Sequence, residues 1–171
     1  MQQPIPSPFG RVRVLHSTDS VAVAESGSIC IVIWRGAVTK EPFEWQRAAL
    51  AEIVKLHPGR AGFMCVIEST AKPPQDELRR ASSQMVLGHG ERLKCVACVI
   101  EGEGFTTAVH RGVLAGMVLL LRNLKSAVSV FAKVDDAARW MGQFNARPHG
   151  EELSSIVEQV RSGLLPSGEN V

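Results

Sequence analysis

Tyrosine is absent from the 171-residue chain, aromatic residues make up only 5% of it, and neither sign of charge dominates. Against 19 Lys and Arg residues stand 17 Asp and Glu residues, which gives a formal net charge of +2. Nucleic-acid-binding proteins usually carry a clustered basic excess, so this balance argues against a nucleic-acid partner. The 45% share of hydrophobic residues excludes a disordered or fibrous chain.

Segments that would direct the chain to a membrane or out of the cell are also lacking. Met1 to Gly10 contains three prolines and no apolar core, unlike a secretory signal. The longest run of apolar residues and glycine, Gly112 to Leu121, is about half of the ~20 residues that a membrane crossing needs. The cysteines lie inside apolar runs, where free thiols behave as small hydrophobic groups: Cys30, Cys65, Cys95 and Cys98. We therefore expect a cytoplasmic protein without membrane insertion.

The hydrophobic pattern begins as a short meander and then alternates between strands and helices. Val12 and Val14 alternate with arginines, a turn follows over 17–20, and Val21 and Val23 mark a second strand. Four strand-then-helix units come next, with strands predicted over 29–34, 63–67, 94–100 and 128–132 and helices over 42–56, 74–87, 105–122 and a short segment opened by Asp135 and Asp136.

The strands of these units are apolar throughout rather than at every second residue, which is typical of a parallel sheet buried on both faces. Crossovers between parallel strands are right-handed, so four units wind into a βα superhelix. The sequence thus predicts an α/β fold: a four-turn βα superhelix with a mainly parallel sheet and an antiparallel N-terminal meander at one edge.

An amphipathic helix is predicted after Pro148, and we divide the chain into a domain over 11–144 and a C-terminal helical extension over 145–171. The apolar stripe of this helix must be covered. The helix predicted over 105–122 has a second apolar stripe, which either the C-terminal helix or a second copy of the chain in a homodimer would meet. The residues of these two stripes are Leu114, Val118 and Leu121, and Leu153, Ile156, Val157 and Val160.

Two short motifs in this order of elements resemble the STAS-like (SpoIIAA-like) superfamily, which includes anti-sigma-factor antagonists and many uncharacterised bacterial proteins. One motif is a strand that ends in Phe131, followed by acidic residues and then Ala137-Ala-Arg-Trp-Met141. The other is Gly36-Ala-Val-Thr39 after the first core strand. The resemblance covers about 11–141. It implies the same fold as the hydrophobic pattern and a non-enzymatic regulatory or scaffold role through binding of partner proteins, and sometimes of nucleotides. We expect no cofactor here and, from the surplus apolar stripes, a homodimer.

In the antagonists of this superfamily, a Ser or Thr in the loop that enters the second helix is phosphorylated and switches binding. The corresponding stretch here runs from Glu68 through Ser69 and Thr70 to Pro74. It lacks the family's Asp-Ser-Ser-Gly-Leu pattern, so the motif that carries the phosphorylation switch is missing. Ser69 and Thr70 are candidates for an interaction loop. A phosphate at a helix N-terminus would be favoured by the helix dipole.

Open α/β sheets bind ligands outside the carboxyl ends of their strands, which predicts where a site would lie. Arg35, the Glu68 loop and Lys133–Asp135 contribute to this rim, together with Gly36, Glu101, Gly102, Gly104, Thr106 and Thr107. Gly102-Glu103-Gly104 fits a turn better than a phosphate-binding loop, since Thr107 stands where a third glycine would be and the Walker lysine is missing. No nucleophile–base pair is evident, so we do not expect an enzyme.

Two further groups of residues have alternative interpretations. Cys95 and Cys98 form a CxxC within a strand, where residues three apart point to opposite faces, so neither a metal site nor a redox motif is expected. Trp34, Trp45 and Trp140 are most simply packing residues, but they could also line a pocket. With the aliphatic helix over 105–122, they support an alternative function as a binding domain for a small apolar molecule or a lipid.

Overall fold

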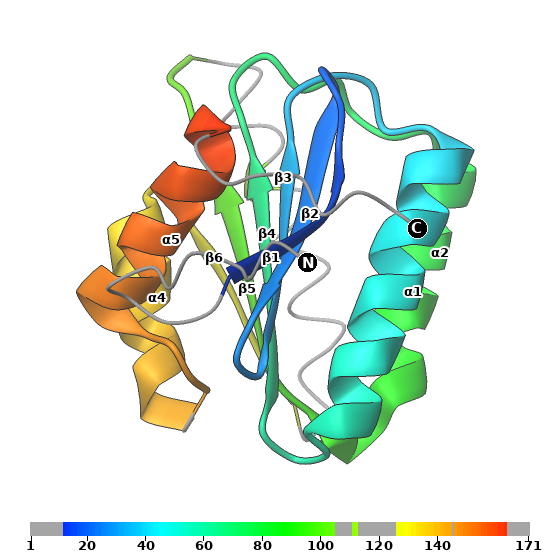
Figure 1. Cartoon of the computed structure of the whole chain (residues 1–171). Helices are drawn as coiled ribbons and strands as arrows, with labels where there is room; N and C mark the ends of the chain where they lie inside the picture. The colour runs from blue at the N-terminus through cyan, green and yellow to red at the C-terminus, as the bar shows by residue number, and fades with distance from the viewer. Residues whose placement is uncertain (1–11, 105–110, 113–125, 145, 164–171) are drawn as a thin grey trace, which may run out of the picture.

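The computed structural model describes residues 12–104, 111–112, 126–144 and 146–163. These residues build a six-stranded sheet with helices packed on both of its faces (Figure 1). In chain order, the strands are β1 (Val12–Ser17), β2 (Val21–Ser26), β3 (Ile29–Trp34), β4 (Ala61–Ile67), β5 (Leu93–Ile100) and β6 (Ala127–Phe131). The order of the strands in space is the same as their order in the sequence.

The pairing of the strands confirms the mixed sheet that the sequence predicts. β1, β2 and β3 pair antiparallel, with a register irregularity between Val14 and His16. β3, β4, β5 and β6 pair parallel. All six residues of β3 are buried, as expected for a strand without alternation between two helix layers.

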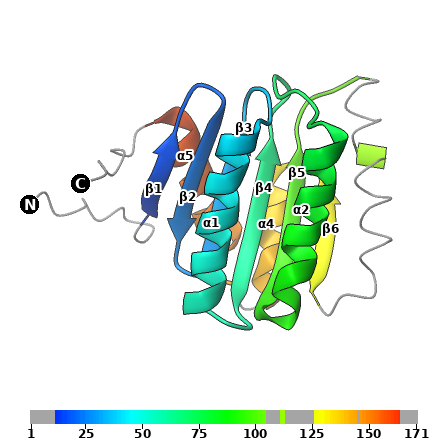
Figure 2. The same cartoon turned by 90° about the vertical axis from the view of Figure 1, so that its right-hand side faces the viewer.

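Helices α1 (Lys40–Leu56) and α2 (Asp76–His89) cover one face of the sheet and lie side by side in Figure 2. Their core includes Leu50 and Ile53 of α1 and Met85 and Val86 of α2. Thr39 stands at the N-cap of α1, but its side chain makes no capping hydrogen bond. A short 3₁₀ turn, η1 (Gly90–Arg92), leads from α2 into β5.

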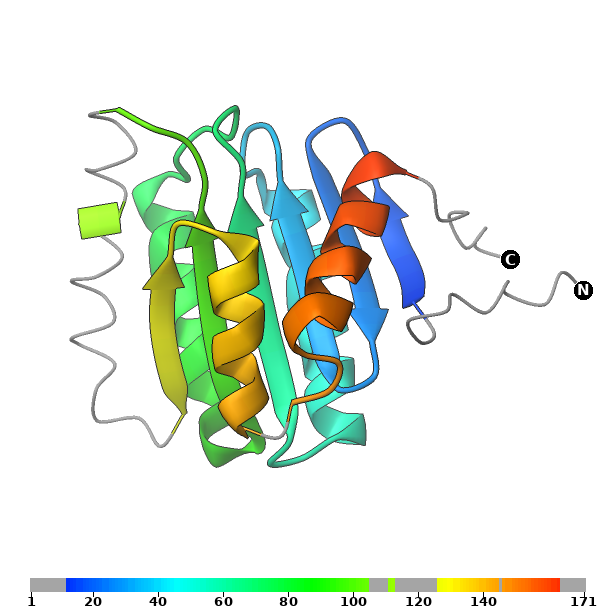
Figure 3. The ribbon, with the colours of Figure 1, turned by 90° about the vertical axis from the view of Figure 1, so that its left-hand side faces the viewer.

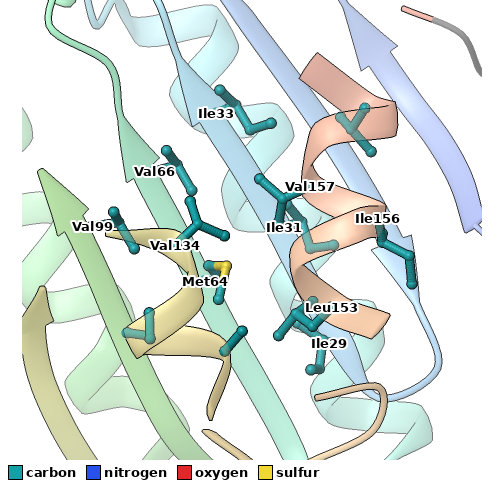
Figure 4. Packing of buried hydrophobic residues seen from close by; sticks show 14 of the residues in the cluster. Ile29, Ile31, Ile33, Met64, Val66, Val99, Val134, Leu153, Ile156 and Val157 are labelled. Atoms are coloured by element: carbon teal, nitrogen blue, oxygen red, sulfur yellow. The ribbon is translucent and has the colours of Figure 1, made fainter. Parts of the chain in front are cut away.

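The opposite face is covered by α4 (Val134–Met141) and α5 (Gly150–Ser162), which Figure 3 shows side by side on the sheet. The 3₁₀ turn η3 (Gly142–Phe144) follows α4. The apolar stripe of α5 packs into one cluster with the sheet and α4 (Figure 4); the cluster includes Ile29, Ile31, Ile33, Met64, Val66, Leu153, Ile156, Val157 and Val160. Thus α5 shares the core of the preceding strands.

The sequence suggested the helix predicted over 105–122 as the element that would meet the C-terminal helix. The sheet and α4 cover the stripe of α5, and small residues of β2, Ala22 and Ala24, lie on this face with it. Leu114, Val118 and Leu121 lie outside the residues that the structure describes, as does most of the predicted helix over 105–122. Within the described ranges, no helix is both long and apolar enough to cross a membrane.

Candidate functional site

Three charged residues form a row at the carboxyl ends of the central strands. Trp34, Ile67 and Ile100 are register partners at the ends of β3, β4 and β5. The residues that follow them are Arg35, Glu68 and Glu101. The backbone ladder continues into this row, because the amide of Glu68 donates to Trp34 O (2.9 Å) and the amide of Glu101 donates to Ile67 O (2.9 Å). The register of the sheet therefore places one guanidinium and two carboxylates next to one another.

A second guanidinium reaches this row from the far end of the chain. Arg161, in the last turn of α5, donates two hydrogen bonds to the carboxylate of Glu101: Nη1 to Oε2 at 3.0 Å and Nη2 to Oε1 at 2.9 Å. Arg35 Nη2 in turn donates to the backbone carbonyl of Arg161 at 3.1 Å. We call Arg35, Glu68, Glu101 and Arg161 the edge cluster. It joins the end of α5 to the ends of three strands.

The fit of Glu68 into the edge cluster is looser than that of Glu101. Glu68 Oε1 lies 3.5 Å from Arg161 Nε and 3.8 Å from Arg35 Nε, which is ion-pair distance but too long for a good hydrogen bond. Both Glu68 Oε1 and Arg161 Nε are buried atoms without a hydrogen-bond partner. The cluster is therefore satisfied on the Glu101 side and incomplete on the Glu68 side.

The side chains of the edge cluster are partly screened from water. Side-chain exposure is 21% for Arg35, 18% for Glu68, 25% for Glu101 and 26% for Arg161. Burial alone would lower the pKa of Arg161, but the hydrogen bonds and charge of Glu101, with the charges of Glu158 and Glu68, raise it above the usual value. Arg161 is thus a permanent cation in this site.

Ser69 and Thr70 form an exposed turn directly beside the edge cluster. The turn is closed by the amide of Ala71, which donates to Glu68 O at 3.0 Å. Two residues beyond the exposed pair, the amide of Lys72 donates to Gly36 O at 3.0 Å, which ties the loop after β4 to the loop after β3. The predicted interaction loop is therefore held in shape by backbone hydrogen bonds, with its hydroxyl residues at the surface.

The loop after β5 completes this edge of the sheet. Gly102 and Gly104 have φ angles of 103° and 107°, which a residue with a side chain rarely adopts, so this segment is a glycine-dependent turn as predicted. Arg111 donates to Ile100 O at 2.8 Å and 3.2 Å and to Gly102 O at 3.1 Å. Thr106 and Thr107 lie outside the described residues.

The tryptophans do not line one common pocket. Trp34 is buried on the α1 and α2 face, where its indole N–H donates to Gln46 Oε1 at 3.0 Å. Trp45 packs against the same cluster and stacks on His16. Trp140 packs on the opposite face, against Phe131 and Phe144. The structure thus separates the tryptophans on which the apolar-ligand interpretation depended.

The cysteines occupy the positions expected of packing residues. Cys95 and Cys98 lie on opposite faces of the sheet, as their spacing in a strand predicted. Burial raises the pKa of the Cys95 thiol to about 12 and that of the Cys98 thiol to about 11. Among the residues that the structure describes, no three or more His, Cys, Asp or Glu side chains come together in a way that could hold a metal ion.

Sequence reasoning found part of the edge cluster and missed its main contact. Arg35, Glu68 and Glu101 were expected at the rim because each directly follows a core strand. Arg161 does not stand out in the sequence, because a basic residue in the last turn of a helix is common. It lies 60 residues from Glu101 and 126 from Arg35 along the chain, so no local spacing pattern could have indicated either contact.

Comparisons with known proteins give one structural likeness. No protein-family model matches the chain, and no curated protein matches it significantly. The chain is similar to an uncharacterised protein of the DUF3478 family from Shewanella loihica PV-4, whose crystal structure has a SpoIIAA-like fold. Identity is 16% and the TM-score 0.47, over 82% of this chain and 98% of the other. A SpoIIAA-like fold is also what the sequence resemblance implies, while the architecture given above rests on this chain's own strands and helices.

Proposed function

We propose that the chain is a non-enzymatic STAS-like domain with a regulatory or scaffold role, and that it binds another protein at the carboxyl edge of its sheet. The observation that carries this proposal is the preformed surface there. Backbone hydrogen bonds join the loop after β4 to the loop after β3 and join Glu101 to the end of β4, and the side chain of Arg161 contacts both Glu101 and Glu68. A surface that is already ordered loses little conformational entropy when a partner docks.

The chemistry of this edge also favours docking over catalysis. The edge cluster is made of Arg and Glu side chains, and charged groups that face a partner of complementary charge orient it and select against wrong partners. The exposed turn at Ser69 and Thr70 adds hydroxyl groups that can donate and accept hydrogen bonds. The partner can be a second copy of this chain or a different protein, and the experiment below separates the two.

Site-specific photocrosslinking in the native host tests this proposal. A photoreactive amino acid at Thr70 is compared with the same residue at Lys55, which is exposed near the opposite end of the sheet, in the last turn of α1. We expect a discrete crosslinked species from Thr70 and none from Lys55. Mass spectrometry then identifies either a second copy or another protein. The proposal is wrong if both positions crosslink alike, or if neither gives a species above background.

A further inference from the structure

Glu101 and Glu68 surround the guanidinium group of Arg161 as a binding site surrounds a ligand. Two parallel N–H···O bonds of 2.9 Å and 3.0 Å to one carboxylate are the arrangement by which proteins recognise arginine specifically. Glu68 approaches the third nitrogen, Nε, from a neighbouring strand. Glu68 and Glu101 directly follow β4 and β5, so the register of the sheet sets the positions of their backbones independently of α5.

The guanidinium that fills this site is not ideally placed. The 3.5 Å between Arg161 Nε and Glu68 Oε1 leaves a donor and an acceptor facing each other unpaired. The packing of α5 sets the backbone position of Arg161, which limits the positions from which its guanidinium can reach Glu101 and Glu68 together. A guanidinium carried by another chain would not have this constraint and could make the third hydrogen bond.

The segment that carries Arg161 is also attached less firmly than the rest of α5. Val160 is the last residue of the buried stripe. Beyond it, the contacts of Arg161, Ser162 and Gly163 are polar: ion pairs and hydrogen bonds at the edge cluster, and bonds back to the preceding turn. Helix ends open at little cost compared with buried turns. If this turn opens, Arg35 balances only one of the two carboxylates, and the site then has a net charge of −1.

We propose that Glu101 and Glu68 form a binding site for an arginine side chain of a partner protein, and that Arg161 occupies this site within the free chain. The partner's arginine replaces Arg161 when the last turn of α5 opens. This inference rests on the proposed function, because it specifies the chemistry of the partner. Arg161 and the partner's arginine then compete for the same two carboxylates.

Chemical rescue tests the site without any partner. In Arg161→Ala, the emptied site should bind methylguanidinium with a dissociation constant of ~1–10 mM at constant ionic strength. Binding is followed by amide chemical shifts around Ser69 and Gly102 and by a rise in melting temperature. Methylammonium, which cannot form the paired hydrogen bonds, should bind at least ~10-fold more weakly. The wild-type chain, whose site is filled, should respond much less to either compound.

Matched variants assign the binding to this site. Adding Glu101→Gln to Arg161→Ala should abolish the response to methylguanidinium. Arg139→Ala, which removes an exposed arginine paired with Asp136 on α4, should not create one. If Arg161→Ala does not fold, Arg161→Leu replaces it in every comparison, because leucine keeps apolar bulk at this position and supplies no hydrogen-bond donor to the carboxylates. The site proposal is overturned if the folded variant shows no saturable response, or if Glu101→Gln leaves the response unchanged.

A tripeptide distinguishes a protein arginine from a free guanidinium compound. Blocked Gly-Arg-Gly should bind Arg161→Ala at least as tightly as methylguanidinium does, and blocked Gly-Lys-Gly at least ~10-fold more weakly. If methylguanidinium binds but the arginine peptide does not, the site excludes a polypeptide and the docking part of the inference is wrong. A positive rescue with negative photocrosslinking would instead retain the arginine site and reject the proposed function.

Discussion

Replacing Gly62 by alanine tests whether β4 and α4 really approach as closely as the structure places them. A Cβ atom on Gly62 would lie 2.8 Å from Met141 Cε, 3.3 Å from Ala146 Cβ and 3.3 Å from Cys95 Sγ. The first distance is shorter than carbon atoms tolerate, and the other two are tight. Met141 Cε ends a flexible side chain, but Met141, Cys95 and Ala146 are all fully buried, so any shift must be made within a packed core.

We expect Gly62→Ala to lower the free energy of unfolding by about 1–3 kcal/mol, the usual cost of forcing one extra group into a packed core. For a chain of this size, that corresponds to a fall of about 2–12 °C in melting temperature. Gly88→Ala is the matched control, because it adds the same methyl group in helix α2, where no atom lies within 4 Å. Alanine is the better helix former, so Gly88→Ala should gain up to about 1 kcal/mol.

Urea unfolding, followed by circular dichroism, measures the free energy of unfolding of both variants. The two values are compared at equal slopes of free energy against urea concentration. A third variant identifies the clashing atom: Met141→Leu removes the terminal methyl group at a cost below about 1.5 kcal/mol. In the Gly62→Ala background it should recover part of the lost stability rather than add to the loss. If Gly62→Ala is neutral or stabilising, or if its effect simply adds to that of Met141→Leu, the close approach of α4 to β4 is wrong.

Three further predictions concern the core and its thiols. Ile156→Ala should lower the free energy of unfolding in urea by about 2–5 kcal/mol, because Ile156 is fully buried on the inner face of α5. A loss no larger than that of the surface variant Glu158→Ala would contradict this placement. Gln46→Leu should cost about 1–3 kcal/mol by the same measurement, because it leaves the buried indole N–H of Trp34 without an acceptor, and unchanged stability would refute that hydrogen bond's role. Burial raises the pKa of Cys98 from 9.0 to about 11, because the folded chain favours the neutral thiol over the thiolate. The contribution of this thiol to stability is therefore complete below pH 9 and is lost as pH rises through 11. The wild-type chain should therefore lose more stability than Cys98→Ala between pH 8 and 11, and equal losses in pH-dependent unfolding would count against the burial of this thiol.

The part of the fold that could be predicted is the part that local pattern determines. An all-apolar run such as β3 can be satisfied only between two helix layers, so the parallel centre of the sheet followed directly from residue types. The alternation around Val12 and Val21 likewise indicated the antiparallel edge. Boundaries shifted by up to two residues: α1 begins at Lys40 rather than at residue 42, and β4 at Ala61 rather than at residue 63.

The location of α5 could not be predicted because a helical stripe indicates that a face is covered but not what covers it. The decisive residues are in β2, where alanines on the α5 side allow close packing and valines face α1. In the sequence, Val21-Ala-Val-Ala24 indicates only a strand. The candidate site shows the same division. The strand ends indicated Glu68 and Glu101, whereas Arg161 is brought to them only by the packing of α5.

The burial of α5 has a consequence for how the chain is made. Ala22, Ala24 and the isoleucines of β3 are among the first core residues synthesised, yet the side chains that shield them from water, Leu153 and Ile156, come some 120 residues later. During translation this face must stay uncovered until α5 has left the ribosome. The nascent chain therefore exposes this apolar face until α5 is synthesised, and a chain truncated before α5 would keep it exposed and prone to aggregation.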